Sequence, residues 1–154
     1  MKKLGLGICA GAAALLAAPA SADLKLSGEP VGDWYIYSEA DAMTDELSCV
    51  AYYKDGKFIQ LTDDSLAVAY RGRGGIKGYQ LRFDEGAPTS MQLPSRSEER
   101  IGALILRGKT FDQVLAANRL RVQGVTVLNS IENDDIDLTD ANAAIGQMQT
   151  MSCK

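Results

Sequence analysis

One segment places cations on a flexible turn and is a candidate binding site. Residues 71–77 read Arg-Gly-Arg-Gly-Gly-Ile-Lys, so Arg71, Arg73 and Lys77 flank three glycines. Positive charges on a glycine turn could surround an anion such as phosphate. The spacing matches neither the Walker loop nor Gly-x-Gly-x-x-Gly, and no helical pattern follows it. We therefore predict an exposed loop between two strands, with charges dispensable for folding, and keep Arg71, Arg73 and Lys77 as a candidate interaction loop.

Neighbouring acidic residues are a second candidate, because a pair of carboxyl groups can hydrolyse a glycosidic bond. Such pairs occur at residues 63–64, 98–99 and 134–135. Adjacent acids on a turn usually point apart into water, and none of these pairs lies in an aromatic run of the kind a sugar site needs. The acids of residues 134–137 lack the glycine and the terminal glutamate of a calcium loop. We predict no catalytic residue and no metal site, with a carboxylate-based hydrolase as the alternative.

The chain contains no histidine, which narrows the possible chemistry. This absence excludes a Ser-His-Asp triad, a Cys-His pair, a histidine general base and zinc sites that use histidine. No cofactor is predicted. The remaining expectation is a protein that binds rather than converts its partner.

The N-terminus has the pattern of a secretory signal. Residues 1–3 are Met-Lys-Lys, residues 4–18 are apolar or small without a charge, and Ala20-Ser21-Ala22 is a small-x-small cleavage motif. We predict cleavage after Ala22 and a periplasmic or secreted protein without a membrane span, because the apolar run is too short to cross a bilayer. Cys9 precedes most of the apolar core, so we expect it to be discarded with the signal and not lipid-modified.

The exported chain is acidic. After Lys2 and Lys3 leave with the signal, 14 basic and 20 acidic residues remain, a formal charge of −6. Nucleic acids and anionic membrane surfaces attract proteins with clustered positive charge, so neither is expected as the main partner. An unknown protein or envelope component is the expected partner, and the oligomeric state is not predicted.

Two cysteines, Cys49 and Cys153, remain in the exported chain. Thiols tend to be oxidised outside the cytoplasm, so we predict one structural disulfide between them. The bond would close a loop of about 100 residues, which chain-entropy arguments value at about 4 to 5 kcal/mol. A catalytic redox pair is disfavoured, because redox motifs keep their cysteines close in sequence.

The elements that position these residues begin with short strands. Lys54-Asp55-Gly56-Lys57 contains an Asp-Gly pair between two β-rich runs, which is a strong hairpin signal. Further turns are expected at residues 63–64 and 72–75. The predicted strands comprise residues 34–37, 47–53, 57–61, 65–70 and 78–84.

The second half of the chain adds helical patterns. Residues 110–113 have the spacing of a capping box, which predicts a helix over 111–118. Thr139 is expected to cap a last helix. Its apolar residues recur at three and four positions: Ala141, Ala144, Ile145, Met148 and Met151.

Two further segments are predicted to be extended, and a third is left undecided between strand and helix. The state of residues 101–106 stays open between strand and helix, with the neighbouring glycines favouring a strand. Residues 119–128 alternate, and Gly124 is expected to mark a bulge in that strand. After the acids of 132–135, residues 136–138 are expected to form a last extended piece.

Aromatic side chains gather on the first two predicted strands. Trp34 is expected in the core, whereas Tyr35 and Tyr53 are candidates for an exposed face. Sequence alone does not separate core aromatics from those at an interface.

The order of these features resembles a known family. Gly32-Asp33-Trp34 opens a strand, Cys49 lies on the next, and Ala143-Ala144-Ile145 lies in an amphipathic segment near the C-terminus, all behind a signal peptide. This arrangement resembles the invasion-associated locus B family of proteobacterial secreted proteins. The resemblance implies a small β-rich envelope protein linked to host-cell interaction, without an established enzymatic activity. It assigns no functional residue to this chain.

Together these patterns predict an α+β protein. We expect a signal peptide at 1–22, a linker at 23–32 and a single domain at 33–154. The domain should be a mostly antiparallel curved β-sheet with two helices in its C-terminal half and one disulfide. The predicted function is a non-catalytic periplasmic or secreted binding module, with a hydrolase or a periplasmic enzyme inhibitor as alternatives.

Overall fold

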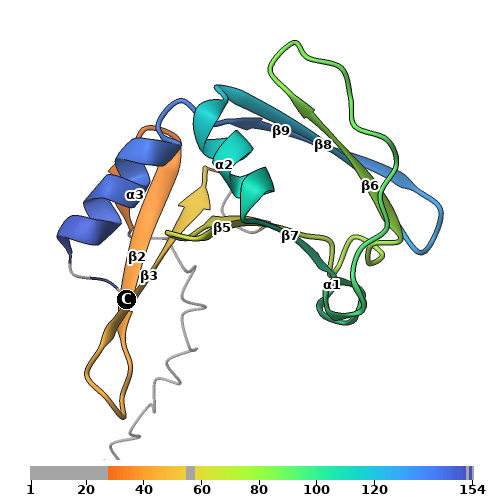
Figure 1. The fold of residues 1–154 in the computed structure, drawn as a ribbon. Coiled ribbons are helices and arrows are strands. Elements are labelled where there is room, and N and C mark those ends of the chain that lie inside the picture. The colour runs from red at the N-terminus through yellow and green to blue at the C-terminus, as the bar shows by residue number, and fades with distance from the viewer. Residues whose placement is uncertain (1–27, 55–57, 152, 154) are drawn as a thin grey trace, which may run out of the picture.

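A computed structural model describes residues 28–54, 58–151 and 153. These residues form two antiparallel sheets and three helices (Figure 1). The α+β fold class is therefore confirmed, with the strands divided between two sheets. The predicted signal at residues 1–22 and the Asp55-Gly56 turn lie outside the described residues.

Six strands form the larger sheet in the order β1-β2-β3-β4-β5-β7. Consecutive strands mostly pair with each other, as hairpin turns in the sequence predict. The predicted linker at 23–32 is too long, because its residues 29–31 form β1 and pair with β2. The strands are β1 (Glu29–Val31), β2 (Trp34–Ala40), β3 (Leu47–Tyr53), β4 (Ile59–Leu61), β5 (Ser65–Ala69) and β7 (Ala103–Arg107).

The smaller sheet has the order β6-β8-β9. Its strands are β6 (Gly78–Phe83), β8 (Arg119–Val125) and β9 (Ile131–Asp137). Leu81 lies opposite Val122, and both are buried, whereas their neighbours along each strand are more exposed. This alternation shows that one face of the small sheet packs on the core.

Three helices follow in the C-terminal half: α1 (Arg96–Ile101), α2 (Lys109–Ala116) and α3 (Ala141–Thr150). In Figure 1, α3 lies over β2 and β3, and α2 lies over β5 and β7. The predicted stripe of α3 is confirmed, since Ala141, Ala144, Ile145 and Met148 are buried. These side chains join a core whose largest fully buried members include Trp34, Tyr70 and Leu120.

Helix caps differ from the prediction. The capping box lies at α1, where the Ser95 hydroxyl accepts from the Glu98 amide and the Glu98 carboxylate accepts from the Ser95 amide. Helix α2 begins after Gly108 and α3 after Asp140, both without a side-chain cap, so the predicted capping box at Thr110 and the predicted cap at Thr139 are wrong. Helix α1 was not predicted, because six residues are too few to show a helical period.

Segment 101–106, left undecided between strand and helix, is mostly a strand: Ile101 ends α1, Gly102 caps it, and β7 spans Ala103–Arg107. Two other predictions about this half are wrong. Residues 132–135, expected to precede the last extended piece, belong to β9, and Gly124 pairs with Glu132 in continuous register without a bulge.

Gly124 has a different role, because the ring of Tyr70 packs against its backbone. A methyl group at this position would lie 2.6 Å from the Tyr70 Cζ atom and 2.7 Å from its hydroxyl oxygen. Tyr70 is fully buried, so its ring has no room to move away. Glycine is therefore required here by the close approach of β8 to the six-stranded sheet.

Replacing Gly124 by Ala is expected to destabilise the protein by about 1 to 3 kcal/mol, the cost of overpacking a core. Gly146→Ala is the matched control, since a methyl group there meets nothing within 4 Å in the middle of α3. That change should stabilise by about 0.5 to 1 kcal/mol through helix propensity. Urea unfolding of both variants checks the pair, and equal effects would contradict the contact.

Candidate functional site

The three cations of the predicted interaction loop lie in different environments. Arg71 and Lys77 are exposed, but the Arg73 side chain is only 17% exposed. Its guanidinium makes two parallel hydrogen bonds to the Asp134 carboxylate, of 2.9 and 3.0 Å, and donates to the Ala69 carbonyl. The expectation of a fully exposed loop is wrong for Arg73, because its partner lies 61 residues away on β9.

Two aromatic rings flank Arg73. Its Cζ atom lies 4.4 Å from the centre of the Tyr70 ring and 5.1 Å from that of Phe58. Burial, and then the Asp134 carboxylate, raise the pKa of Tyr70, so its hydroxyl stays protonated and donates to Asp134 across 3.2 Å. Burial opposes the charge of Arg73, but Asp134, together with Tyr70 and Glu132, outweighs burial and raises the Arg73 pKa.

This cluster connects the two sheets. Arg73 follows β5 of the larger sheet, whereas Asp134 lies on β9 of the smaller one. Because the guanidinium already has a carboxylate partner, it offers little to an external anion. Arg73 therefore acts as a structural clamp.

The two candidate exposed tyrosines also differ from each other. Tyr35 is half-buried, but Tyr53 is only 5% exposed. The Tyr53 hydroxyl accepts from the Asp137 amide at 3.0 Å and donates to Asp33 at 3.3 Å. The prediction of an exposed Tyr53 is wrong, because its ring packs 5.2 Å from the ring of buried Trp34.

The side chains that best form a site lie on the small sheet, on the face turned away from the core. We call this surface the outer face. Each of the three helices has its main contacts with strands of the other sheet, so within the described part of the chain no helix packs mainly on the outer face. Its side chains form cross-strand rows, since Gln80, Gln123 and Asn133 lie opposite one another, and so do Arg82, Arg121 and Asp135.

A hollow of about 340 Å³ lies over these rows, bounded by Pro88. The amide row offers donors and acceptors in the hollow, and Gln123 donates to Asn133 within it at 3.1 Å. The charges of the second row already have partners: Arg82 and Arg121 both contact Glu85 at 3.1 Å, and Arg121 lies 3.8 Å from Asp135. Such a surface suits a polar, uncharged segment more than a free anion.

Exposed apolar side chains border the same face. Within the described residues, five of the nine large exposed hydrophobic side chains come from two short segments, 91–93 and 127–131. A methyl group at Gly78 would lie 3.2 Å from the Met91 sulfur, and Gly78 lies opposite Val125, which lies opposite Ile131. The segments therefore converge on one end of the outer face. Met91 is 48% exposed and Ile131 is 61% exposed.

The carboxylates beside this face are held in their charged form. A hydrogen bond from Arg119 lowers the pKa of Asp135, and bonds from Thr139 lower that of Asp137. A general acid for glycoside hydrolysis needs a raised pKa. Every resolved shift of a carboxyl pKa among the described residues is downward, so none of these groups has that property.

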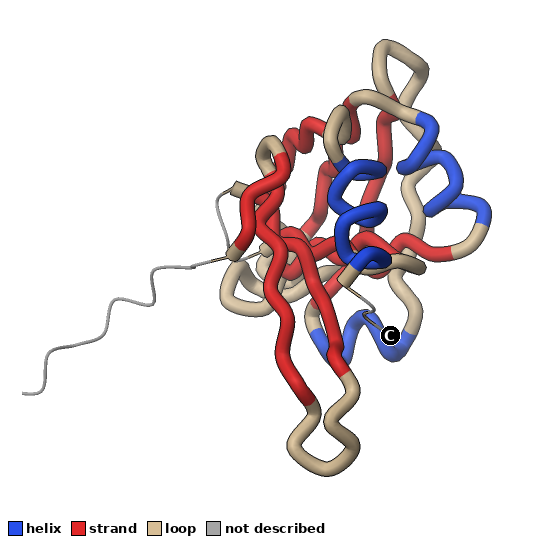
Figure 2. Tube along the Cα trace, turned by 90° about the vertical axis from the view of Figure 1, so that its left-hand side faces the viewer, coloured by secondary structure: helices blue, strands red, loops and turns tan. Residues whose placement is uncertain are grey.

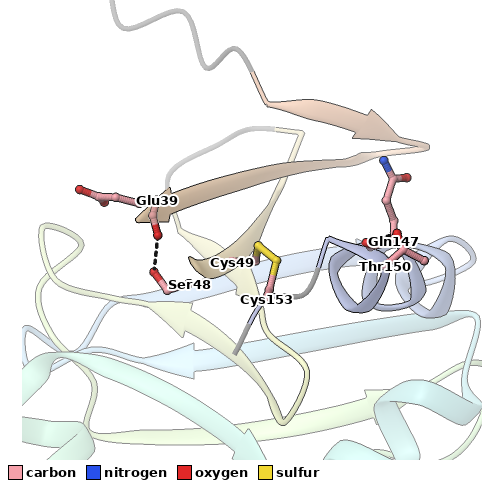
Figure 3. Close-up of a disulfide and its surroundings, with 6 residues drawn as sticks. All are labelled: Glu39, Ser48, Cys49, Gln147, Thr150 and Cys153. Carbon is pink, nitrogen blue, oxygen red and sulfur yellow. Dashed lines mark hydrogen bonds between the residues drawn. A yellow bond between two sulfur atoms is a disulfide. The ribbon is translucent and has the colours of Figure 1, made fainter. Parts of the chain in front are cut away.

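The predicted disulfide joins Cys49 and Cys153, whose Cα atoms lie 5.5 Å apart (Figure 3). Cys49 lies on β3, and Cys153 follows α3, which packs on β2 and β3. The apolar stripe of α3 thus lays its C-terminal end on the sheet, as predicted. Among the described residues, no helix is long and apolar enough to cross a membrane, and no group of three potential metal ligands occurs.

The fold of the chain also occurs in a protein of known structure. The chain is similar to the crystal structure of invasion associated protein B from Bartonella henselae, over 81% of this chain and 96% of that one. The sequence identity is 14% and the TM-score is 0.51. The two chains share a fold. No protein-family model matches the sequence, and no curated protein matches it.

The shared fold confirms the loose resemblance read from the Trp34 strand and Cys49. It adds no residue to the site, because similarity at this level concerns architecture. The outer-face residues were not predicted as a site. Their signal in the sequence is the alternation of Gln80-Leu81-Arg82 and Arg121-Val122-Gln123, which marks two polar faces without showing that they adjoin.

Proposed function

We propose that this chain is a non-catalytic binding module, and that its outer face holds a protein or another envelope component. The observation that supports this most directly is the meeting of an exposed apolar end with a polar hollow on one open sheet face. Contiguous exposed apolar surface rimmed by polar groups is typical of interaction sites. The shared fold with an invasion-associated protein is compatible with this class.

The proposal places the protein outside the cytoplasm, in the periplasm or secreted, after cleavage following Ala22. The Cys49–Cys153 disulfide is compatible with this location, because such bonds persist in oxidising compartments. The hydrolase alternative needs a carboxyl group with a raised pKa near a second one. The lowered pKa values of Asp135 and Asp137 favour the binding module.

The combined Met91→Glu and Ile131→Glu variant tests the outer face. Both side chains are exposed, so folding should be unaffected, but two charges would oppose an apolar contact. We expect at least a tenfold loss, about 1.4 kcal/mol or more, in capture of the partner from periplasmic extract, measured by quantitative mass spectrometry.

Met43→Glu is the matched control, since Met43 is 92% exposed on the β2–β3 hairpin, away from this face. It should capture the same partner as the unchanged protein. Equal capture by all three proteins would overturn the outer face as the site. Turnover of chromogenic glycosides that is lost in Asp135→Asn would favour the hydrolase instead.

A further inference from the structure

A second surface of the molecule is a two-stranded ribbon that extends beyond the sheet. Strand β1 pairs with β2 only as far as Ile36, and β4 pairs with β3 only from Ala51 onward. Among the described residues, segment 37–50 therefore has no neighbouring strand outside the hairpin. Figure 2 shows this hairpin projecting from the body of the molecule. Residues 38–48 are all exposed, so little of the ribbon is stabilised by burial.

The ribbon is nevertheless held in one shape at both ends. At its tip, the Asp41 carboxylate accepts from the amides of Met43 and Thr44 at 2.8 and 3.0 Å, and these bonds lower the Asp41 pKa. At its base, Cys49 forms the disulfide with Cys153 (Figure 3). Cys49 lies on β3 directly opposite Ser38 on β2. An isolated ribbon is marginally stable in water, so these devices keep a solvent-exposed element ordered.

The surface of the ribbon is uniformly acidic with an apolar tip. Residues 38–48 contain four acidic residues and no basic one. Met43, at the tip, is 92% exposed, the highest exposure among the described large hydrophobic residues. A complementary surface would be a basic groove with apolar atoms at its rim.

The chain itself carries such a groove. Gly72, Gly74, Gly75 and Gly102 help to line a hollow of about 500 Å³ between the glycine loop and α1. Arg71 and Arg100 lie on its walls, both exposed, and neither side chain forms an ion pair with any described residue. Ile101, 43% exposed, adds an apolar wall, and Glu99 is the one acid among the lining residues. We call this hollow the basic groove.

The ribbon and the groove of one molecule cannot meet. Strands β3 and β5 run parallel to each other, because both are antiparallel to β4. The ribbon tip lies before the start of β3, whereas Arg71 lies beyond the end of β5. The two surfaces therefore lie at opposite ends of the sheet, and any contact between them joins two molecules.

We propose that the acidic ribbon of one copy docks into the basic groove of a second copy, with Met43 against Ile101. The contact is heterologous, since different patches meet, and repeated copies would form a head-to-tail series. This self-association uses neither Met91 and Ile131 nor the polar rows of the outer face, although Val127 and Leu128 lie against the glycine loop that lines the groove. Variants at Met91 and Ile131 therefore separate it from the proposed partner site.

Sedimentation velocity of the exported protein tests this contact. At about 0.01 M salt the Debye length is about 30 Å, and at about 1 M it is about 3 Å. We expect concentration-dependent association at low salt that disappears at high salt. A protein that stays monomeric at low salt over the accessible concentration range would overturn the proposal.

Charge reversal on each side identifies the surfaces. Arg71→Glu with Arg100→Glu makes the groove acidic, and Glu39→Lys with Asp45→Asn and Glu46→Lys makes the ribbon basic. Asn suits position 45, whose φ is +56°. Either variant alone should associate more than tenfold more weakly, because like charges then face each other. A mixture of the two variants should associate again, since each ribbon then meets a groove of opposite sign.

Arg107→Glu with Lys109→Glu is the matched control, since both cations are exposed and do not line the groove. It should associate like the unchanged protein. Persistence of association in the groove variant, or failure of the mixture to associate, would overturn the docking. Loss of association in the Met91→Glu and Ile131→Glu variant, with the groove variant unaffected, would assign self-association to the outer face instead.

Discussion

Reduction of the Cys49–Cys153 disulfide is expected to lower the free energy of unfolding by about 4 to 5 kcal/mol. The bond joins residues 104 positions apart, so it restricts most of the unfolded chain. Reduction of the bond raises the conformational entropy of the unfolded chain, while the packing of α3 on β2 and β3 in the folded state remains. Urea unfolding of the exported protein, with and without reductant, measures the difference. The slope of the free energy with urea should rise in reductant, because the reduced unfolded chain exposes more surface.

The combined Cys49→Ser and Cys153→Ser variant is the control. It should unfold at the same lowered urea midpoint as the reduced protein and show no response to reductant. Two free thiols in the native exported protein would contradict the bond. A midpoint unchanged by reduction, with both thiols then titratable, would show that α3 packing alone holds the C-terminus.

The N-terminal strands could be predicted because their signals are local. Strand β3 has the predicted bounds, Leu47–Tyr53, since the β-rich run there is followed in the sequence by an Asp-Gly pair, a local signal for the end of a strand. Strand β7 could only be favoured, because an apolar run of this length fits either state. Its assignment depends on pairing with β5, in which Leu104 lies opposite Val68. Such a long-range partner is invisible in the local pattern.

Strand β9 shows why an acidic strand was missed. Asp and Asn are depleted in strands, and residues 131–137 contain four acids. The neighbouring strand compensates, because Arg121 lies opposite Asp135 and Arg119 opposite Asp137. Cross-strand pairs of opposite charge stabilise a sheet. The outer face was missed for the same reason, since its rows exist only in the register of three strands.

The second large effect is expected at the Arg73–Asp134 clamp. Arg73→Ala should lower the free energy of unfolding by about 2 to 4 kcal/mol, because it leaves a largely buried carboxylate without its cation, with only the Tyr70 hydroxyl still donating to it. Asp134 is only 13% exposed, so water cannot fully replace the guanidinium. Asp134→Asn removes the charge of Asp134 and leaves Arg73 with the carboxylate of Glu132, which lies at 3.9 Å, beyond hydrogen-bond distance. That variant should lose a similar amount in urea unfolding.

Three further variants separate the clamp from a general effect of charge. Arg73→Lys keeps the charge but not the planar pair of hydrogen bonds, so an intermediate loss is expected. The double variant Arg73→Met with Asp134→Leu removes both charges and should lose less than either single truncation. Arg71→Ala, two residues away but exposed, should change the free energy of unfolding by no more than about 0.5 kcal/mol. A loss below about 0.5 kcal/mol in Arg73→Ala would instead place Arg73 in solvent, where it could reach an anion together with Arg71.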